Sequence, residues 1–412
     1  MKFIADFHIH SKYSRATSRD MDIDHIAEWA RLKGIQLMGT GDFTHPLWLS
    51  ELKRKLKPLG NGLFEFGEVK FILTSEVSNI FSKNGKVRKI HNMIFAPSFD
   101  VVEKIVRELG RIANLTSDGR PIMGLPAKDL MEIVLSVSSQ NVLIPCHAWT
   151  PWFSIFGANS GFDSIEECFE EYSANIFAIE TGLSSDPAMN WRLSKLDNIS
   201  LISCSDAHSP SKIGREVCVF DTDLSYKAII DAIKSRDNSK FLYTIEFFPE
   251  EGKYHYDGHR NCGILWSPAE TKKHNGICPK CKRKVTVGVM NRVDLLADRA
   301  EGFAPNNRVP FKNLVPLPEI IGEAIGKSPS TSSVDREYRR LVSQFGSEFK
   351  ILIEVPIEDL VGFAPGKISE GIKRVREGRL SIVPGYDGVY GKINIFDGRE
   401  DVISSEKQMG LF

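Results

Sequence analysis

Six of the ten histidines in this chain stand at or near the ends of predicted β-strands: His8, His10, His45, His91, His147 and His208. His8 and His10 form a His-x-His pair, and side chains two residues apart on a strand point to the same side, so both imidazoles can bind one ion. The same alternation brings Asp206 and His208 together. Glu76 is a carboxylate of the kind that bridges two ions. Because imidazole and carboxylate together suit Zn, Mn or Fe better than Mg or Ca, the pattern predicts a metal centre.

The chemistry expected of such a centre is hydrolysis of a phosphate ester. Two divalent ions about 3.5 to 4 Å apart can bind a phosphodiester, lower the pKa of a bridging water and stabilise the leaving oxygen, so no side-chain nucleophile is required. A lone histidine is more often a structural residue, but the recurrence of histidines and carboxylates at successive strand ends favours metal binding. His45 and Glu180 are predicted to contact phosphate or to orient a ligand.

The elements that must position these side chains are short β-rich runs that alternate with helical patterns over the first 245 residues. This alternation predicts an α/β fold with a parallel barrel or sheet. The predicted strands are 2–7, 35–39, 70–74, 89–95, 141–146, 176–179 and 199–204. In such a fold the loops that follow the carboxyl ends of the strands converge at one mouth, where we expect the candidate ligands to meet.

The length of 412 residues predicts a large catalytic domain with smaller additional ones. We expect a catalytic barrel at 1–248, a small zinc-binding module at 249–300 and a mixed, DNA-binding C-terminal domain at 301–412. Hydrophobic content of 42% and charged content of 26% are typical of a soluble globular protein. No apolar run approaches the roughly 20 residues that a membrane span needs, so we expect no membrane partner and a cytoplasmic location.

The net charge of zero argues against a strongly basic nucleic-acid binder. Residues 1–252 nevertheless carry more acidic than basic side chains, and residues 253–412 carry more basic ones. This distribution fits an acidic metal-binding part joined to a part that meets polyanions, and chance explains it equally well.

Two short knuckles, HRNC at 259–262 and CPKC at 278–281, fit a tetrahedral zinc site of the ribbon type. A CxxC motif alone also suits redox chemistry, but no thioredoxin-like βαβ pattern surrounds it. One structural zinc ion is therefore expected, with the ligands His259, Cys262, Cys278 and Cys281. His255 and His274 compete with His259 for the fourth position.

The motifs FHIHSKYS, TGDFTH, SEV, HN, PCHAW, ETG and SDAH resemble, in this order, those of the PHP family, the polymerase and histidinol phosphatase phosphoesterases. The resemblance implies a PHP-type distorted (β/α)7 barrel with two or three divalent ions (Zn, Mn, Mg or Fe). It implies a first ion held by His8, His10, Glu76 and Asp206, and a second held by Glu76, His91 and His147. A third would be bound by Asp42 and His208. Asp42 stands where many members have a histidine, which weakens the expected third site.

The motifs YHYDGHRNC, NGICPKC, VGVMNRVDLLADR and PGYDGVYGKI extend a resemblance to the endonuclease Q family over nearly the whole chain. This resemblance implies a DNA repair endonuclease that nicks 5′ of deaminated bases (hypoxanthine, xanthine, uracil) and of abasic sites. The implied partner is double-stranded or single-stranded DNA with such lesions, and a replication clamp is a further candidate. The implied catalytic residues are Glu76, Asp206, His208 and His147.

Inspection of a damaged base requires that the base leave the stack, so we expect base flipping near the metal ions. The aromatic candidates for base contact are Tyr13, Trp149 and Trp152, with packing of the barrel rim as the alternative for Trp152 and Phe153. Lys373, Arg374 and Arg376 form a basic cluster that suits phosphate contacts, with a solvated helix face as the equal alternative.

Two other functions compete with DNA nicking. A small-molecule PHP phosphatase resembling histidinol-phosphate phosphatase would explain the metal motifs but not the zinc module. A non-catalytic DNA-binding accessory protein would explain the C-terminal part. Its barrel should then have lost metal ligands, but only the motif at Asp42 departs from the metal pattern.

Overall fold

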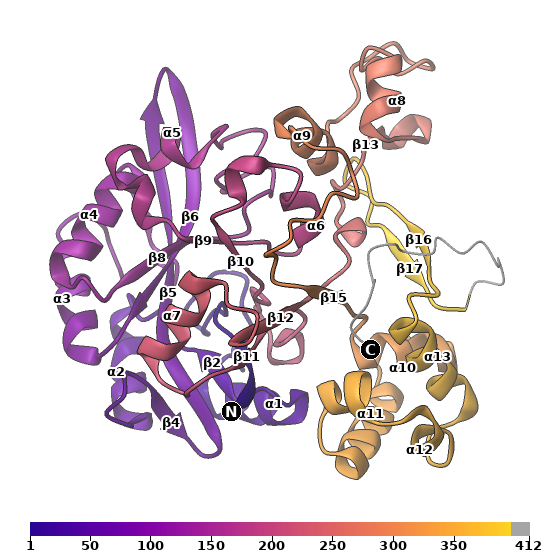
Figure 1. The fold of residues 1–412 in the computed structure, drawn as a ribbon, viewed down its shortest axis with the longest axis horizontal. Coiled ribbons are helices and arrows are strands. Elements are labelled where there is room, and N and C mark those ends of the chain that lie inside the picture. The colour runs from indigo at the N-terminus through magenta and orange to yellow at the C-terminus, as the bar shows by residue number, and fades with distance from the viewer. Residues whose placement is uncertain (397–412) are drawn as a thin grey trace.

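Strand β1 (Lys2–Asp6) lies within a mixed sheet of 11 strands that organises the N-terminal part of the protein (Figure 1). The computed structural model describes residues 1–396. The main path runs β15-β12-β11-β1-β2-β5-β4-β3, with β7 beside β5 and with β6 joining β5 to β8. The other strands of this sheet are β2 (Leu37–Gly39), β3 (Lys57–Pro58), β4 (Phe64–Phe66), β5 (Val69–Lys83), β6 (Lys86–Ala96), β7 (Ile122–Met123), β8 (Val142–Pro145), β11 (Val217–Asp221), β12 (Phe241–Glu246) and β15 (Phe311–Asn313).

The parallel pair β9 (Ala178–Glu180) and β10 (Ser200–Ile202) completes a ring with strands of this sheet. Ala148, just after β8, donates its N–H to the carbonyl of Glu180 at 2.9 Å. Ile9, just after β1, forms a parallel bridge with Ala207, just after β10. The seven predicted strands are present as β1, β2, β5, β6, β8, β9 and β10, so the predicted α/β class with a distorted barrel is confirmed.

The prediction that all these strands are parallel is wrong for β6, which runs antiparallel to both β5 and β8. Strands β5 and β6 are one long hairpin that extends beyond the barrel (Figure 1). Asn84 and Gly85 close it with φ angles of 52° and 71°, the left-handed conformation that a two-residue hairpin turn requires. Two strands joined by so short a turn can only be antiparallel.

Helices pack around the ring, and polar side chains cap the N-termini of several of them. Asp22, Ser98, Ser164 and Ser225 each accept a backbone N–H at a helix N-terminus. The helices of this part are α1 (Ile23–Lys33), α2 (Pro46–Lys55), α3 (Phe99–Leu109), α4 (Ala127–Val137), α5 (Ile165–Phe169), α6 (Pro187–Asn190) and α7 (Tyr226–Ser235). Buried residues from nine strands, β1 among them, form one apolar cluster with α7, which supports the strands just before their polar ends.

The part beyond β12 contains a small module and a helical group (Figure 1). The module consists of β13 (Asp257–His259), β14 (Ile264–Trp266), α8 (Pro268–Lys273) and α9 (Val289–Leu296). Figure 1 shows the helical group on the side of the molecule away from α3 and α4. It consists of α10 (Leu317–Ile325), α11 (Ser332–Phe345), α12 (Ile357–Val361) and α13 (Gly366–Arg376), and is followed by the hairpin β16 (Ser381–Val383) and β17 (Lys392–Asn394).

The expected boundary between module and C-terminal domain does not coincide with the strand pairing. β15 lies within the expected 301–412 domain, yet it pairs with β12 as the outermost strand of the main sheet. The loop between β16 and β17 returns to the module, where Asp387 accepts the N–H of Arg260 at 2.7 Å and the hydroxyl of Thr286 at 2.6 Å. Residues 397–412 of that expected domain lie outside the described residues. None of the helices in residues 1–396 combines the length and the apolar character that crossing a lipid bilayer requires.

Candidate metal centre

Glu76 stands at the middle of the cluster that the sequence predicts. Its strand β5 carries it into the ring, where its side chain is fully buried. The Oε2 atom lies 3.2 Å from Nε2 of His10 and 3.6 Å from Nε2 of His8. The Oε1 atom lies 2.8 Å from Nδ1 of His91 and 3.2 Å from Nε2 of His147. One carboxylate therefore faces two groups of histidines through its two oxygens, which is the arrangement of a bridging ligand.

The first group is completed by Asp206, whose Oδ1 lies 3.1 Å from Nε2 of His10 and 3.7 Å from Nε2 of His8. These three atoms, Nε2 of His8, Nε2 of His10 and Oδ1 of Asp206, are buried and have no hydrogen-bond partner. Buried polar atoms are otherwise almost always paired. Donor atoms of nitrogen and oxygen that converge without partners fit a divalent cation. The residues predicted for the first ion and for the second are thus brought together.

Two buried carboxylates hold the histidines in place from behind. The carboxylate of Glu180 accepts one hydrogen bond from Nδ1 of His8 at 2.9 Å and another from the backbone N–H of His147 at 2.8 Å. Asp42 lies 3.1 Å from Nδ1 of His10. A carboxylate on the far nitrogen fixes the tautomer so that Nε2 faces the ion. The orienting role predicted for Glu180 agrees with this geometry.

The prediction that Asp42 binds a third ion does not agree with its contacts. Besides His10, its carboxylate accepts the N–H and the hydroxyl of Ser11, both at 2.6 Å, and the hydroxyl of Ser14 at 2.8 Å. The side chain is fully buried, and within residues 1–396 it belongs to no group of donors that could share an ion. The hydrogen bonds that occupy its oxygens make Asp42 a residue that positions His10.

His208 remains a candidate ligand at the open side of the cluster. Its ring centroid lies 4.4 Å from that of His10, and with His10 and Asp206 it forms a third group of donors. His45 instead stacks on Tyr13 with ring centroids 4.5 Å apart. Tyr13 is partly buried and packs against the hydrophobic core.

The backbone is strained at three residues of the cluster. Asp42, His147 and Asp206 have φ angles of 47°, 30° and 46°, a region that residues other than glycine rarely adopt. Such conformations cost about 1–3 kcal/mol each and persist where the surroundings determine them. They lie in the loops just after β2, β8 and β10, so the strain serves to aim side chains at one point.

The electrostatics of the cluster suit metal ligands. Burial would raise the pKa of Glu76, but its close contacts with His91 and with the guanidinium of Arg120 outweigh burial and hold that pKa well below its ordinary value. Burial lowers the pKa of His91 to about 4, so the imidazole is neutral and able to bind a metal. Burial would lower the pKa of His8 and of His10. The carboxylate of Glu180 outweighs burial at His8, and that of Asp42 does so at His10, so both pKa values lie well above the ordinary value. A metal ion that binds to His8 or His10 must therefore displace a proton from the imidazole.

Arg120 is a residue of this site that the sequence reasoning missed. It follows α3 in a loop and its guanidinium lies 3.0 Å from Oε2 of Glu76. An arginine in a loop carries no ligand signature, so only its neighbours in space reveal it.

Four side chains converge where the sequence predicts a zinc site. The candidate ligand atoms of His259, Cys262, Cys278 and Cys281 all lie within 4.8 Å of one another. Of the two competitors for the fourth position, His274 stacks on Trp266 at 4.5 Å between ring centroids, and His255 stacks on Tyr256 at 5.2 Å. The geometry therefore favours His259.

Two of the predicted DNA contacts are directed into the protein. Trp149 is 1% exposed and donates its ring N–H to Asn190 at 2.8 Å, so it packs the rim of the barrel. Arg376 donates to the carbonyls of Ile351, Leu352 and Val355 and closes the end of a helical turn. Neither side chain is free to contact DNA.

The other predicted contacts stay accessible to different degrees. Trp152 is 53% exposed, with the ammonium of Lys89 5.5 Å from its ring. Lys373 is partly buried. Arg374 pairs with Glu370 at 2.9 Å and with the carbonyl of Ile395 at 3.1 Å.

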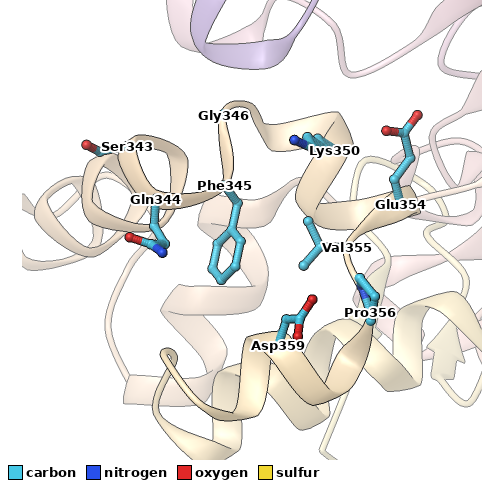
Figure 2. Close-up of a pocket in the computed structure, with 9 residues that line it drawn as sticks. All are labelled: Ser343, Gln344, Phe345, Gly346, Lys350, Glu354, Val355, Pro356 and Asp359. Atoms are coloured by element: carbon cyan, nitrogen blue, oxygen red, sulfur yellow. The ribbon is translucent and has the colours of Figure 1, made fainter.

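A separate cavity of about 430 Å³ lies in the C-terminal helical group, between the end of α11 and α12 (Figure 2). Its charged side chains are Lys350, Glu354 and Asp359. It contains no histidine or cysteine, and we assign no metal chemistry to it.

Comparison with family models matches residues 316–379 to the MJ0043 C-terminal domain. The uncharacterised protein MJ0043 of Methanocaldococcus jannaschii is 33% identical over 256 residues, which cover 60% of this chain and 31% of that protein. The uncharacterised protein YqxK of Bacillus subtilis is 29% identical over 414 residues, which cover 95% of this chain and 99% of that protein.

Two solved structures share the whole fold. The lesion-specific endonuclease PfuEndoQ from Pyrococcus furiosus has a TM-score of 0.86 and 34% identity, and the match covers 96% of this chain and 95% of that one. Endonuclease Q in complex with a 27-mer duplex that has an abasic lesion at the active site has a TM-score of 0.85 and 34% identity, with 96% and 97% covered. At this identity over almost the full length of both chains, the chain belongs to the endonuclease Q family.

Proposed function

We propose that this protein is a metal-dependent DNA repair endonuclease that nicks the phosphodiester on the 5′ side of deaminated bases and abasic sites. The observation that carries the proposal is a set of buried donor atoms without hydrogen-bond partners, Nε2 of His8, Nε2 of His10 and Oδ1 of Asp206. The two histidine nitrogens face both Oδ1 of Asp206 and Oε2 of Glu76. A second line of support is the relative whose complex holds a duplex with an abasic lesion at its active site.

The residues that would hold divalent ions are those with converging donor atoms. His8, His10 and Glu76 would hold one ion, with Asp206 joining them through its contacts to both histidines, and Glu76, His91 and His147 would hold a second. His208 forms a group with His10 and Asp206 and is placed to join the first ion. When bound, such ions supply Lewis-acid activation of water and neutralisation of phosphate charge. The metal identity and the number of ions are part of the proposal, with Zn, Mn, Mg and Fe as candidates.

The protein's own residues have three tasks in this reaction. Glu180 and Asp42 hold His8 and His10 in the tautomer that presents Nε2. The strained loops at His147 and Asp206 keep their side chains aimed at Glu76. Burial of the cluster excludes water from the ligands and strengthens every charge interaction within it.

Recognition of the lesion is assigned to the exposed side of the cluster. A deaminated base carries a carbonyl where an amine was, so the pocket must offer hydrogen-bond donors there. Tyr13 and Trp152 are the remaining aromatic candidates for contact with a flipped base, and Lys373 and Arg374 remain candidates for phosphate contact. A replication clamp as partner and a nucleoid-associated location are further predictions.

The test is a nicking assay with duplexes that carry a single abasic site, deoxyinosine or deoxyuridine, beside an undamaged duplex and a generic phosphomonoester. Each is incubated with Mn²⁺ or Mg²⁺. We expect a nick 5′ of the lesion only, and none with Glu76→Gln. Turnover of the monoester alone would identify a small-molecule phosphatase, and DNA binding without cleavage would identify an accessory protein. Equal cutting of undamaged DNA would contradict lesion specificity.

A further inference from the structure

Arg120 has a place at the metal cluster that none of the roles assigned above explains. Its NH1 atom lies 3.0 Å from Oε2 of Glu76, the same oxygen that faces His8 and His10. The side chain is 25% exposed, whereas that of Glu76 is fully buried. Arg120 therefore lies between the buried ligands and the solvent, on a side from which a substrate can approach.

The loop that carries Arg120 is fixed to the cluster at close range. A Cβ atom on Gly119 would lie 2.3 Å from Oδ2 of Asp42, so only glycine allows the loop to pass there. Gly119 donates its N–H to the carbonyl of Tyr13 at 3.0 Å and accepts the hydroxyl of Thr44 at 3.3 Å. Asp118 accepts the N–H of Arg120 at 3.1 Å. These bonds fix the backbone from which the guanidinium reaches Glu76.

The charge of Arg120 is permanent, because a guanidinium stays protonated in proteins. Without ions, Arg120 balances part of the buried negative charge of Glu76. With divalent cations bound to that carboxylate, a third cation at the same oxygen would be repelled by them. Two other carboxylates, Asp206 and Asp118, act on the guanidinium, but Asp206 faces the same ion site, so a loaded centre favours a further anion against Arg120.

We propose that Arg120 binds a non-bridging oxygen of the phosphate group that the metal centre cuts. The planar guanidinium donates two parallel N–H bonds to phosphate oxygens, which a lysine ammonium does not. Arg120 thereby contacts the reacting group and stabilises the charge that develops on it. This inference rests on the proposed function for its substrate, but phosphate binding by itself does not require DNA cleavage.

The experiment therefore begins with a probe other than DNA. Protein loaded with Mn²⁺ is titrated with inorganic phosphate in a calorimeter, as wild type, Arg120→Gln and Arg120→Lys. Arg15→Gln is the matched control, because Arg15 lies in the same region, pairs with Asp118 and is largely exposed. Binding of Mn²⁺ to each variant is measured separately, and the circular dichroism spectra establish that each variant is folded.

We expect Arg120→Gln to weaken phosphate binding at least about tenfold, with Arg120→Lys intermediate and Arg15→Gln unchanged. Binding of Mn²⁺ should be retained by all variants. If Arg120 only balances the charge of Glu76, Arg120→Gln will alter Mn²⁺ affinity and leave phosphate affinity of the loaded protein unchanged, which overturns the proposal.

A second readout connects the residue to the reaction. In single-turnover nicking of the abasic duplex, Arg120→Gln should slow the cut by about 100-fold or more, as for loss of one donor to a developing oxyanion. Its affinity for the duplex should change little, because many phosphates share that affinity. If wild type binds phosphate through Arg120 but cuts no DNA, the proposed function fails and the inference stands. Nicking at the wild-type rate by Arg120→Gln contradicts the inference alone.

Discussion

The Nδ1 atom of His8 lies 2.9 Å from Oε1 of Glu180, a pair in which both side chains are buried. This contact leaves Nε2 of His8 to face Glu76 and Asp206. Glu180→Gln should weaken Mn²⁺ binding about 10- to 100-fold, because loss of a carboxylate behind a histidine ligand has that effect. Calorimetric titration of the metal-free protein measures it, with the exposed Glu171→Gln as control. Unchanged affinity would show that Glu180 does not support the ligand.

Asp42→Asn separates a positioning role from the third metal site that the sequence predicts. If Asp42 positions His10, the variant binds the same number of Mn²⁺ ions as wild type but binds them about tenfold or more weakly. Metal analysis of the protein after saturation and gel filtration counts the ions. A loss of one whole ion with the others bound at normal affinity would restore the predicted third site.

The zinc module should depend on Cys278 and not on the nearby His274. Cys278→Ser is expected to lose the zinc ion and to destabilise the module, since a structural zinc site contributes directly to folding. His259→Asn should weaken zinc binding, whereas His274→Asn should retain it. Zinc content after dialysis against a chelator measures these effects. If His259→Asn retained zinc and His274→Asn lost it, the fourth ligand would be His274 and not His259.

A buried glutamate away from the metal ligands gives the protein a pH-dependent stability. Burial raises the pKa of Glu246 from 4.5 to about 7, although the hydroxyl of Thr244 at 2.5 Å and that of Thr181 at 3.1 Å partly offset it. Between pH 4.5 and 7 the folded protein binds the proton more tightly than the unfolded chain, so this group's contribution to stability falls as the pH rises. The total loss above pH 7 is on the order of 3 kcal/mol.

Glu246→Gln removes this titration. We expect the variant to unfold at a higher temperature than wild type at pH 8 and to show little difference at pH 5. Thermal unfolding of both proteins across this range checks it, with the exposed Glu171→Gln as control. A difference between variant and wild type that does not change with pH would exclude a buried titrating carboxyl at this position.

The metal ligands were accessible to sequence reasoning because most of them stand at or near strand ends, whereas Glu76 and His91 lie within β5 and β6. The pair His8 and His10 could be assigned to one ion because side chains two residues apart on a strand point to the same side. The partners that meet them, Glu76 and Asp206, come from distant strands and required the family resemblance. The turn at Asn84 and Gly85 was a readable signal for the antiparallel β6, because Asn-Gly between two β-rich runs favours a tight hairpin.

Other features depended on contacts that no local pattern encodes. Arg376 belongs to a basic cluster in the sequence, but the carbonyls at the end of a helical turn draw it inward. Trp149 follows a ligand histidine as Trp152 does, yet only Trp152 is exposed. Arg120 reaches Glu76 from a loop whose path depends on the close approach of Gly119 to Asp42.

The central claim is that the two oxygens of Glu76 bind neighbouring cations, and anomalous diffraction from crystals soaked in Mn²⁺ tests it most directly. We predict two anomalous peaks, one on each side of the Glu76 carboxylate and each about 2.0–2.2 Å from its ligand atoms. One peak should lie against His8, His10 and Asp206, and the other against His91 and His147. Absence of any peak at Glu76 under saturating Mn²⁺ would contradict the account.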